Sequence, residues 1–249
     1  MSDPRIIRIP ILPFGMVNCH LIAGPAGCIL IDTGLPGSEG KIGRALRREG
    51  LAFKDIRLIV ITHAHVDHAG SAARLRALSG APIVAHAGDL RYYTQELAMT
   101  FCATGWFGRL FLKTGLIRRP YAPFVPDILL AADDILDLVS YGMAGAVRHT
   151  PGHTDGSISV ELASGQAMVG DLIASGVLLG GIWRTGHAIR PPFEDDPRQT
   201  AAALQRLLDS GAGTFYMGHG GPLRAPEVQA HAHRLRRATT DCCRAAATE

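Results

Sequence analysis

The chain has 249 residues and a formal net charge of +3 at pH 7, with 47% hydrophobic and 19% charged residues. This composition excludes an intrinsically disordered chain, and the length suffices for one large domain or two small ones. The charge is too small to indicate a nucleic-acid partner, and no apolar stretch of the sequence is long enough to span a membrane.

In the first half of the chain, predicted strands alternate with predicted helices, which favours helices packed against sheets. Short apolar, β-branched runs separated by glycine and proline turns predict the strands. Ser38 and Gly50 are the start and stop signals of one helix. The predicted elements are strands at 5–11, 16–23 and 28–32, a helix at 38–49, a strand at 58–62, a helix at 71–79 and a strand at 82–86.

The segment at about 89–126 differs from the rest because it holds eight of the fifteen aromatic residues (Phe 8, Trp 2, Tyr 5). It is too long for a simple connection between two strands, so we expect a helical insertion. Long excursions in compact domains are often functional, which favours a lid over the site. The alternative is a helical hairpin that packs on the core or on a partner subunit.

The second half returns to short strands, with one helix that begins at Pro197, a favoured first-turn residue. Nothing marks a linker, so we expect a single domain over residues 1–249. The arginine-rich last helix lacks interleaved aromatic residues and is interpreted as a solvated face. The predicted elements are strands at 128–130, 145–149, 157–162 and 167–170, a glycine-rich loop at 177–192, a helix at 197–208, a strand at 214–217 and a helix from 226 to about 240.

The order of these elements predicts an α/β (α+β) fold, a four-layer αββα sandwich of two similar halves. The first residues lack the basic-then-apolar layout of a signal peptide, and the five cysteines contain no C-x-x-C spacing. We therefore expect a cytoplasmic protein with a small-molecule substrate and without nucleic-acid or membrane partners. A homodimer stays open.

The run from Thr62 to Gly70 places three histidines and an aspartate within six residues, directly after a predicted buried strand. His63 and His65 are two positions apart, so on an extended segment both side chains point the same way. Asp67 and His68 fall in the turn that follows and can face a second point nearby. One cation is difficult to reach from all four side chains, whereas two adjacent cations are not, so the run predicts a two-metal site.

Three further candidate ligands lie downstream, each beside glycine and after a short apolar run: His153, Asp171 and His219. Imidazole and carboxylate groups bind zinc, manganese and iron, and catalytic sites leave one position open for water or substrate. A single loop histidine is more often a surface or packing residue. The clustering of so many ligand types favours a metal site.

The H-x-H-x-D-H run, the later Gly-His-Thr, Gly-Asp and Gly-His-Gly, in that order, resemble the metallo-β-lactamase-fold hydrolases over about Ile6 to His219. The resemblance implies a helical insertion above a metal cleft and two divalent metal ions, zinc before manganese or iron. One metal would be held by His63, His65 and His153, the second by Asp67, His68 and His219, with Asp171 bridging both. Asp32 matches an early aspartate that braces the ligand loop. A plain turn residue at the end of a strand is an equal alternative for Asp32.

Two cations about 3.5–4 Å apart can share one water and lower its pKa, which leaves a hydroxide as the nucleophile. Asp67 and Asp171 are the expected catalytic carboxylates: Asp171 bridges the metals, and Asp67 accepts a proton from the attacking water. Such a site suits hydrolysis of an ester, lactone or thioester carbonyl. A phosphodiester substrate at the same site is an alternative.

Departures from the family pattern bear on the substrate. β-Lactam-hydrolysing members carry cysteine or histidine near the place of Asp171, so β-lactamase activity is not expected. The ligand set resembles the branch of glyoxalase II-like thioesterases and N-acyl homoserine lactonases. The segment after His219 is too short for the C-terminal helical domain of the glyoxalase II-like thioesterases. Ala174 stands where the N-acyl homoserine lactonases have a pocket tyrosine.

The lid and the loop at 177–192 are expected to select the substrate. The candidate pocket residues are Tyr92, Tyr93, Trp106, Tyr121, Trp183 and His187. A different class is a persulfide dioxygenase with one iron, which His63, His153 and Asp171 could hold, although all seven filled ligand positions favour two metals. A third is a metal-binding sensor without turnover.

Overall fold

The structure is a computed structural model that describes residues 4–238. Its first sheet has six strands in the order β1 to β6. The strands are β1 (Arg5–Pro10), β2 (Asn18–Gly24), β3 (Gly27–Ile31), β4 (Ile56–Val60), β5 (Ile83–His86) and β6 (Ile128–Leu130). β1, β2 and β3 pair antiparallel, and β3 to β6 pair parallel, so β3, β4 and β5 end at the same edge of the sheet.

The second sheet also has six strands, in the order β14-β13-β10-β9-β8-β7. Its strands are β7 (Ile135–Asp137), β8 (Gly145–His149), β9 (Ile158–Leu162), β10 (Gln166–Met168), β13 (Thr214–Tyr216) and β14 (Leu223–Arg224). β10 and β13 pair parallel, and the other neighbours pair antiparallel.

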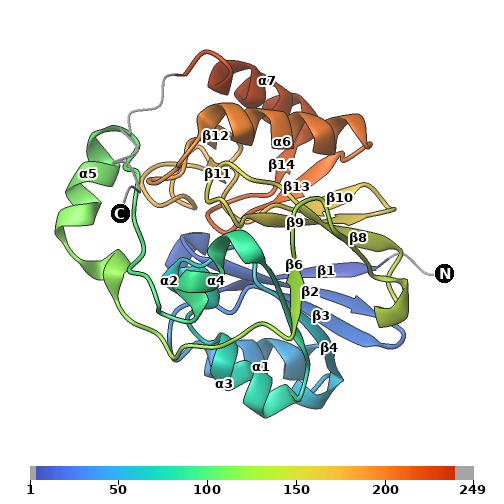
Figure 1. Cartoon of the computed structure of the whole chain (residues 1–249). Coiled ribbons are helices and arrows are strands. Elements are labelled where there is room, and N and C mark those ends of the chain that lie inside the picture. The colour runs from blue at the N-terminus through green and yellow to red at the C-terminus, as the bar shows by residue number, and fades with distance from the viewer. Residues whose placement is uncertain (1–3, 239–249) are drawn as a thin grey trace.

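Helices cover the outer face of each sheet, which gives four layers (Figure 1). α1 (Glu39–Arg48) and α3 (Ala72–Ser79) pack on the first sheet, and α6 (Pro197–Asp209) and α7 (Ala225–Leu235) pack on the second. In β3, Ile29 and Ile31 join the core between the sheets, while Leu30 joins the core under the helices. This alternation follows from the two-residue period of a strand that is buried on both faces. The predicted αββα sandwich is confirmed.

Local signals explain where most elements begin and end. Asp196 caps α6 by accepting hydrogen bonds from the backbone N–H groups of Arg198 and Gln199, and Pro197 opens the helix as expected. The prediction that the last helix continues to about residue 240 is wrong, because α7 ends at Leu235. Leu235 is the last member of the buried face of α7, so the arginines that follow have no core to pack against. Residue 240 itself lies outside the described residues.

Some elements lack a clear sequence signal. β7 and β14 were not predicted, and neither was the ribbon of β11 (Ala174–Ser175) and β12 (Ala188–Ile189), whose second strand lies inside the glycine-rich loop. Each of these strands has three residues or fewer, too few to show a period. The remaining short helices are η1 (Pro13–Gly15), η2 (Phe53–Asp55), α2 (Val66–Ala69) and η5 (Val139–Tyr141).

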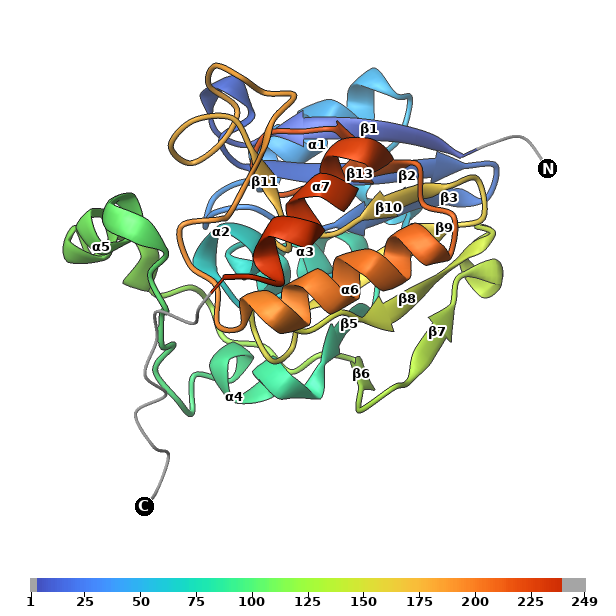
Figure 2. The ribbon, with the colours of Figure 1, turned by 90° about the horizontal axis from the view of Figure 1, so that it is seen from above.

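The chain between β5 and β6 forms η3 (Ala87–Asp89), α4 (Leu90–Tyr93), α5 (Gly105–Lys113) and η4 (Leu116–Arg118). α5 lies beside the sandwich, away from both sheets in two perpendicular views (Figures 1 and 2). The backbone N–H of Thr104 donates to Pro192 at 2.8 Å, and Phe111 packs on Phe193, so the insertion is fixed at its base. Within residues 4–238, no helix combines the length and the apolar character needed to cross a membrane.

Candidate metal centre

The candidate ligands come from loops that follow the strands of both sheets. His63 and His65 follow β4, and the short helix α2 carries Asp67 and His68. The second sheet contributes three residues, which are His153 between β8 and β9, Asp171 after β10 and His219 after β13. Backbone hydrogen bonds join the loops of the two sheets, with Ile158 N–H donating to Thr62 at 2.9 Å and Asn18 N–H to Gly218 at 2.7 Å. The site therefore lies where the two sheet edges meet.

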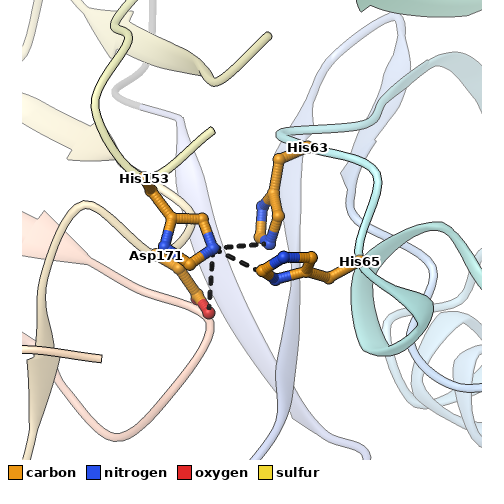
Figure 3. A group of neighbouring side chains, drawn as sticks. All are labelled: His63, His65, His153 and Asp171. Atoms are coloured by element: carbon orange, nitrogen blue, oxygen red, sulfur yellow. Dashed lines mark hydrogen bonds and ion pairs between the residues drawn. The ribbon is translucent and has the colours of Figure 1, made fainter. Parts of the chain in front are cut away.

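A first group brings together His63, His65, His153 and Asp171, with ligand atoms within 4.8 Å of one another. Nε2 of His153 lies 3.1 Å from Nε2 of His63 and 3.1 Å from Nδ1 of His65 (Figure 3). Oδ2 of Asp171 lies 3.9 Å from the same His153 nitrogen. All four side chains are buried, so three ring nitrogens and a carboxylate face one small space.

A second group brings together Asp67, His68 and His219 within the same distance. Nε2 of His219 lies 3.5 Å from Oδ2 of Asp67 and 2.9 Å from Oδ2 of Asp171. Oδ1 of Asp171 lies 3.4 Å from Nε2 of His68. Asp171 thus touches both groups. The structure brings together all seven residues that the sequence singled out, and their role as metal ligands stays a prediction.

Hydrogen bonds on the outer side of the rings orient the histidines. Nδ1 of His68 lies 2.8 Å from Oδ2 of Asp32, and Nδ1 of His219 faces the carbonyl of Met16. Because a carboxylate and a carbonyl only accept, both Nδ1 atoms donate. The hydroxyl of Thr62 donates to Asp32, so it accepts from Nδ1 of His63 at 3.1 Å. In these three rings the Nε2 atom therefore faces the centre, the arrangement that metal-binding histidines adopt.

Asp32 contacts the ligand loop at several points. Besides His68, its carboxylate accepts from the backbone N–H of Thr62 at 2.8 Å. Its backbone has a φ of 59°, a strained conformation for a residue other than glycine. Asp32 is almost fully buried, and this strained backbone conformation directs its carboxylate to Thr62 and His68. These are the contacts that the bracing role requires.

Asp89 is a site residue that the sequence reasoning missed. Its Oδ2 accepts from the backbone N–H of Ala64 and from the hydroxyl of Thr154, both at 2.9 Å, and its Oδ1 accepts from the N–H of Gly156 at 2.9 Å. Burial raises the pKa of Asp89 to about 6, against the lowering effect of these hydrogen bonds. The carboxylate joins the loop of His63 and His65 to the loop of His153. An acidic residue just after β5, at the edge where β4 also ends, was the available signal.

The histidines of the first group have lowered pKa values, whereas those of the second group have raised ones. Burial lowers the pKa of His65 and of His153 to about 3, and the pKa of His63 is also lowered well below its usual value. Burial disfavours the charge of His219 as well, but the Asp171 carboxylate raises its pKa to about 9. Neutral rings that face one another cannot all be hydrogen-bonded to each other. Without a cation the first group therefore has ring nitrogens that can only accept and find no donor, and the second group holds protons.

Unpaired atoms indicate that cations fit this donor set. Nε2 of His68, Oδ1 of Asp67 and Oδ1 of Asp171 are buried and have no hydrogen-bond partner among the described residues. Buried polar groups without partners are rare and costly. Imidazole nitrogens and carboxylate oxygens are ligands that zinc and manganese accept, so a pair of divalent ions would satisfy all three atoms.

The protonation difference predicts unequal pH dependence of metal binding. A second ion must displace protons from His219, whose pKa is about 9, and from His68, whose pKa the Asp171 carboxylate also raises, so its affinity should fall at least about tenfold per pH unit as the pH drops below 9. The first group has no such proton, because His65 and His153 have pKa values of about 3. Zinc titration of metal-free protein against a competing chelator at pH 6, 7 and 8 measures both affinities. Equal slopes for the two ions would contradict this.

Gly218 has no side chain, and the side chains of two candidate ligands fill the space where its Cβ would lie. A Cβ at this position would lie 2.3 Å from Cε1 of His68 and 2.4 Å from Oδ1 of Asp171. Gly218→Ala should therefore displace the second group and reduce metal content from two ions to one, as measured by elemental analysis. Gly186→Ala is the matched control, because a Cβ there meets nothing within 4 Å. Full metal content in Gly218→Ala would show that these ligands are not fixed.

A cavity of about 500 Å³ lies between the ligand loop and the insertion. Its walls include Leu97, Met99, Phe101 and Ile117, and it reaches His65. Its volume falls within the range of small-molecule sites. The predicted pocket residues Tyr92 and Tyr121 also line it.

The other predicted pocket residues do not line this cavity. Tyr93 is fully buried in the core against Phe124, where its bulk fills space under the sheet. Trp106 and Trp183 are 72% and 76% exposed, on the outer side of α5 and on the loop between β11 and β12. Nδ1 of His187 lies 3.0 Å from Glu227 on α7. The sequence does not determine the direction of these side chains, and a role for them in a substrate pocket stays a prediction.

Tyr121 is not free to act as a proton donor. Its hydroxyl donates to the carbonyl of Ala64 at 3.0 Å, and burial raises its pKa above the usual value. Tyr121 thus supports the backbone between His63 and His65.

The chain was compared with known proteins. The model of the metallo-β-lactamase superfamily matches residues 12–219. A probable metallo-hydrolase of Methanocaldococcus jannaschii is 30% identical over 207 residues, which cover 82% of this chain and 87% of the relative. The probable metallo-hydrolase YflN of Bacillus subtilis is 27% identical over 82% of this chain and 79% of its own length. A crystal structure of a metallo-β-lactamase family protein from Thermus thermophilus is 26% identical with a TM-score of 0.63, covering 95% of this chain and 79% of that one.

Proposed function

Because this chain belongs to the metallo-β-lactamase superfamily, we propose that it is a dinuclear metal-dependent hydrolase that acts on the carbonyl of an ester, lactone or thioester. The observation that carries the proposal is the position of Asp171, whose two oxygens lie 3.4 Å from His68 and 2.9 Å from His219 while it also belongs to the first group. A carboxylate in that place suits a bridge between two ions. Relatives named as probable metallo-hydrolases agree with this class of reaction.

Seven side chains would hold the metals: His63, His65, His153, Asp171, Asp67, His68 and His219. Two bound ions would supply a Lewis acid and a water that ionises near neutral pH. Asp67 has 13% of its side chain exposed, more than its neighbours in the site, and its Oδ1 has no hydrogen-bond partner. An oxygen without a protein partner supports the role of Asp67 as the acceptor of a proton from the attacking water. Asp32 and Asp89 hold the loops that carry the histidines.

The cavity beside His65 supports a carbonyl substrate with an apolar part. Leu97, Met99, Phe101 and Ile117 present hydrocarbon and aromatic surface, which suits an acyl or aryl group, while Arg118 and Arg119 in the same walls suit an anionic group of the substrate. This supports the lactonase-like or thioesterase-like branch. The insertion supplies most of these walls and would select the substrate.

The test combines metal analysis with a substrate panel. The purified chain should hold two zinc or manganese ions and hydrolyse members of a panel of aryl esters, lactones and thioesters. A chelator should remove the activity, and added zinc should restore it. β-Lactams and phosphodiesters belong in the same panel as comparisons.

The other outcomes separate the alternatives. One iron per chain with oxygen uptake on persulfides would replace the proposal with a dioxygenase. Hydrolysis restricted to phosphodiesters would keep the site and change the substrate class. Two bound metals without turnover on any member of the panel would favour a metal-binding sensor.

A further inference from the structure

The cavity beside His65 has charged side chains of one sign in its walls. Its lining contains two arginines, Arg118 and Arg119, and neither aspartate nor glutamate. Within residues 4–238, neither guanidinium group has a hydrogen-bond or ion-pair partner. A guanidinium group keeps its charge throughout the working pH range and presents a fork of N–H donors that matches a carboxylate or a phosphate. The cavity therefore offers two unused donors to an anion.

The segment that carries these arginines is fixed to the ligand loop on both sides. Before them, Ile117 is buried in one apolar cluster with Val66, which lies inside the ligand loop. After them, the hydroxyl of Tyr121 donates to the carbonyl of Ala64 at 3.0 Å. The arginines thus have a constant position along the chain relative to the candidate metal ligands.

The backbone between these two anchors is also restrained. Arg119 precedes Pro120, which favours an extended conformation at the residue before it, and Arg119 has a φ of −59° and a ψ of 131°. The carbonyl of Tyr121 accepts a hydrogen bond from the side chain of Gln95. A restrained backbone loses less conformational freedom when a ligand binds, so this segment suits a binding subsite.

The position of the arginines indicates what kind of substrate they meet. The cavity reaches His65 of the first group and has apolar walls at Leu97, Met99 and Phe101. A neutral acyl or aryl group would fill the apolar part and leave both arginines paired with water alone. A cavity of about 500 Å³ suits a small molecule and is too small for a polymeric anion. A small molecule with an apolar part and an anionic group uses the whole lining.

We propose that the substrate carries an anionic group, a carboxylate or a phosphate, in addition to the carbonyl that is cleaved, and that Arg118 and Arg119 bind this group. The two arginines select the substrate and take no part in the chemical step. The inference rests on the proposed function, because it places the cleaved carbonyl at the metal centre. The first experiment therefore measures binding without turnover.

Binding is measured by calorimetry on the full chain as purified, with hexanoate, hexyl phosphate and the neutral hexanol as probes. Both anions should bind more tightly than hexanol, and the comparison of the two shows which anionic group is preferred. Added salt should weaken only the anions, because exposed charges are screened. The double variant Arg118→Gln/Arg119→Gln should weaken the preferred anion about tenfold, a modest factor for charged hydrogen bonds because both side chains are exposed.

Arg91→Gln is the matched control for the double variant. Arg91 is an exposed arginine of the same insertion, on α4, and does not line the cavity. Its loss should change anion affinity much less. Circular dichroism and the melting temperature show whether each variant is folded, and the single variants Arg118→Gln and Arg119→Gln replace the double variant if it is not.

Turnover tests the same subsite with a matched pair of esters. The 4-nitrophenyl monoester of suberic acid has a free carboxylate at the end of its acyl chain, and 4-nitrophenyl octanoate has a methyl group there. The ratio of kcat/KM for the first to that for the second should fall about tenfold in the double variant, through KM rather than kcat, because the arginines bind the substrate and do not contact the carbonyl.

The outcomes separate this inference from the proposed function. Anion binding no tighter than hexanol binding would overturn the subsite, and unchanged anion affinity in the double variant would assign the anions to the metal ions. Equal weakening by Arg91→Gln would reduce the effect to the general charge of the insertion. Ester hydrolysis with an unchanged ratio in the double variant would keep the proposed function and overturn the subsite. Arginine-dependent anion binding without hydrolysis of any ester would support the subsite and contradict the proposed reaction.

Discussion

Replacing Asp171 with alanine should release both metal ions and lower kcat/KM by at least about a thousandfold, equivalent to about 4 kcal/mol of transition-state stabilisation. The reason is its position between the groups, 2.9 Å from His219, 3.4 Å from His68 and within the cluster of His63, His65 and His153. The change also leaves the protonated His219 and His68 facing each other without the carboxylate that raises their pKa values. Elemental analysis of the purified variant and steady-state kinetics measure the two effects.

Single-group variants are the controls for Asp171→Ala. His65→Ala should weaken only the first ion, and His219→Ala only the second, because each residue belongs to one group. Each variant should retain about one metal per chain. If Asp171→Ala also kept one ion and a measurable fraction of the activity, Asp171 would belong to one group and the bridge would be wrong.

Replacing Asp89 with alanine should weaken metal binding by about 10–100-fold although Asp89 touches no metal ligand, a size typical of residues that orient ligands. Its loss frees the loop between His63 and His65 from the loop after His153. It also leaves the buried N–H groups of Ala64 and Gly156 without partners, at about 1–3 kcal/mol of unfolding free energy each. Zinc affinity measured with a chelator and chemical denaturation of metal-free protein separate these effects.

A matched carboxylate distinguishes positioning from general stability. Asp127 also accepts a backbone N–H, that of Ile83 at 2.9 Å, but lies at the far end of β5 from Asp89. Asp127→Asn should lower stability without changing metal affinity. A fall in zinc affinity no larger in Asp89→Ala than in Asp127→Asn would assign Asp89 to folding alone.

The parts of the fold that the sequence predicted are those with strong periodic signals. β8 has the predicted bounds, and β3, β4 and α3 lie within two residues of theirs, because apolar runs and capping residues fix such elements. The three-residue strand β6 also has the predicted bounds, although it is too short to show a period. The two-residue strands β11 and β14 depend on tertiary pairing, which leaves no local pattern. α7 is shorter than predicted because its length depends on where the buried core ends, which the local sequence does not show.

The residues of the candidate site also fall into those that the sequence predicted and those that it missed. His63, His65, Asp67 and His68 lie in one run, so their proximity follows from the chain itself. Asp89 was missed because its partners, Ala64, Thr154 and Gly156, offer backbone and hydroxyl groups that have no distinctive sequence. The prediction that Tyr93 and Trp106 line the cavity failed, because sequence spacing does not determine which side of a short helix faces a cavity. Tyr93 is buried in the core, and Trp106 points to solvent.

The division of ligands between the sheets has a consequence for biosynthesis. The first group needs His153 and Asp171 from the second sheet, and the second group needs His219, near the end of the family match. A growing polypeptide that has left the ribosome only as far as β6 carries the histidine-rich run but can complete neither group. The first group can therefore be completed only after Asp171 has left the ribosome, and the second only after His219, so an ion bound before then would be held by a partial ligand set.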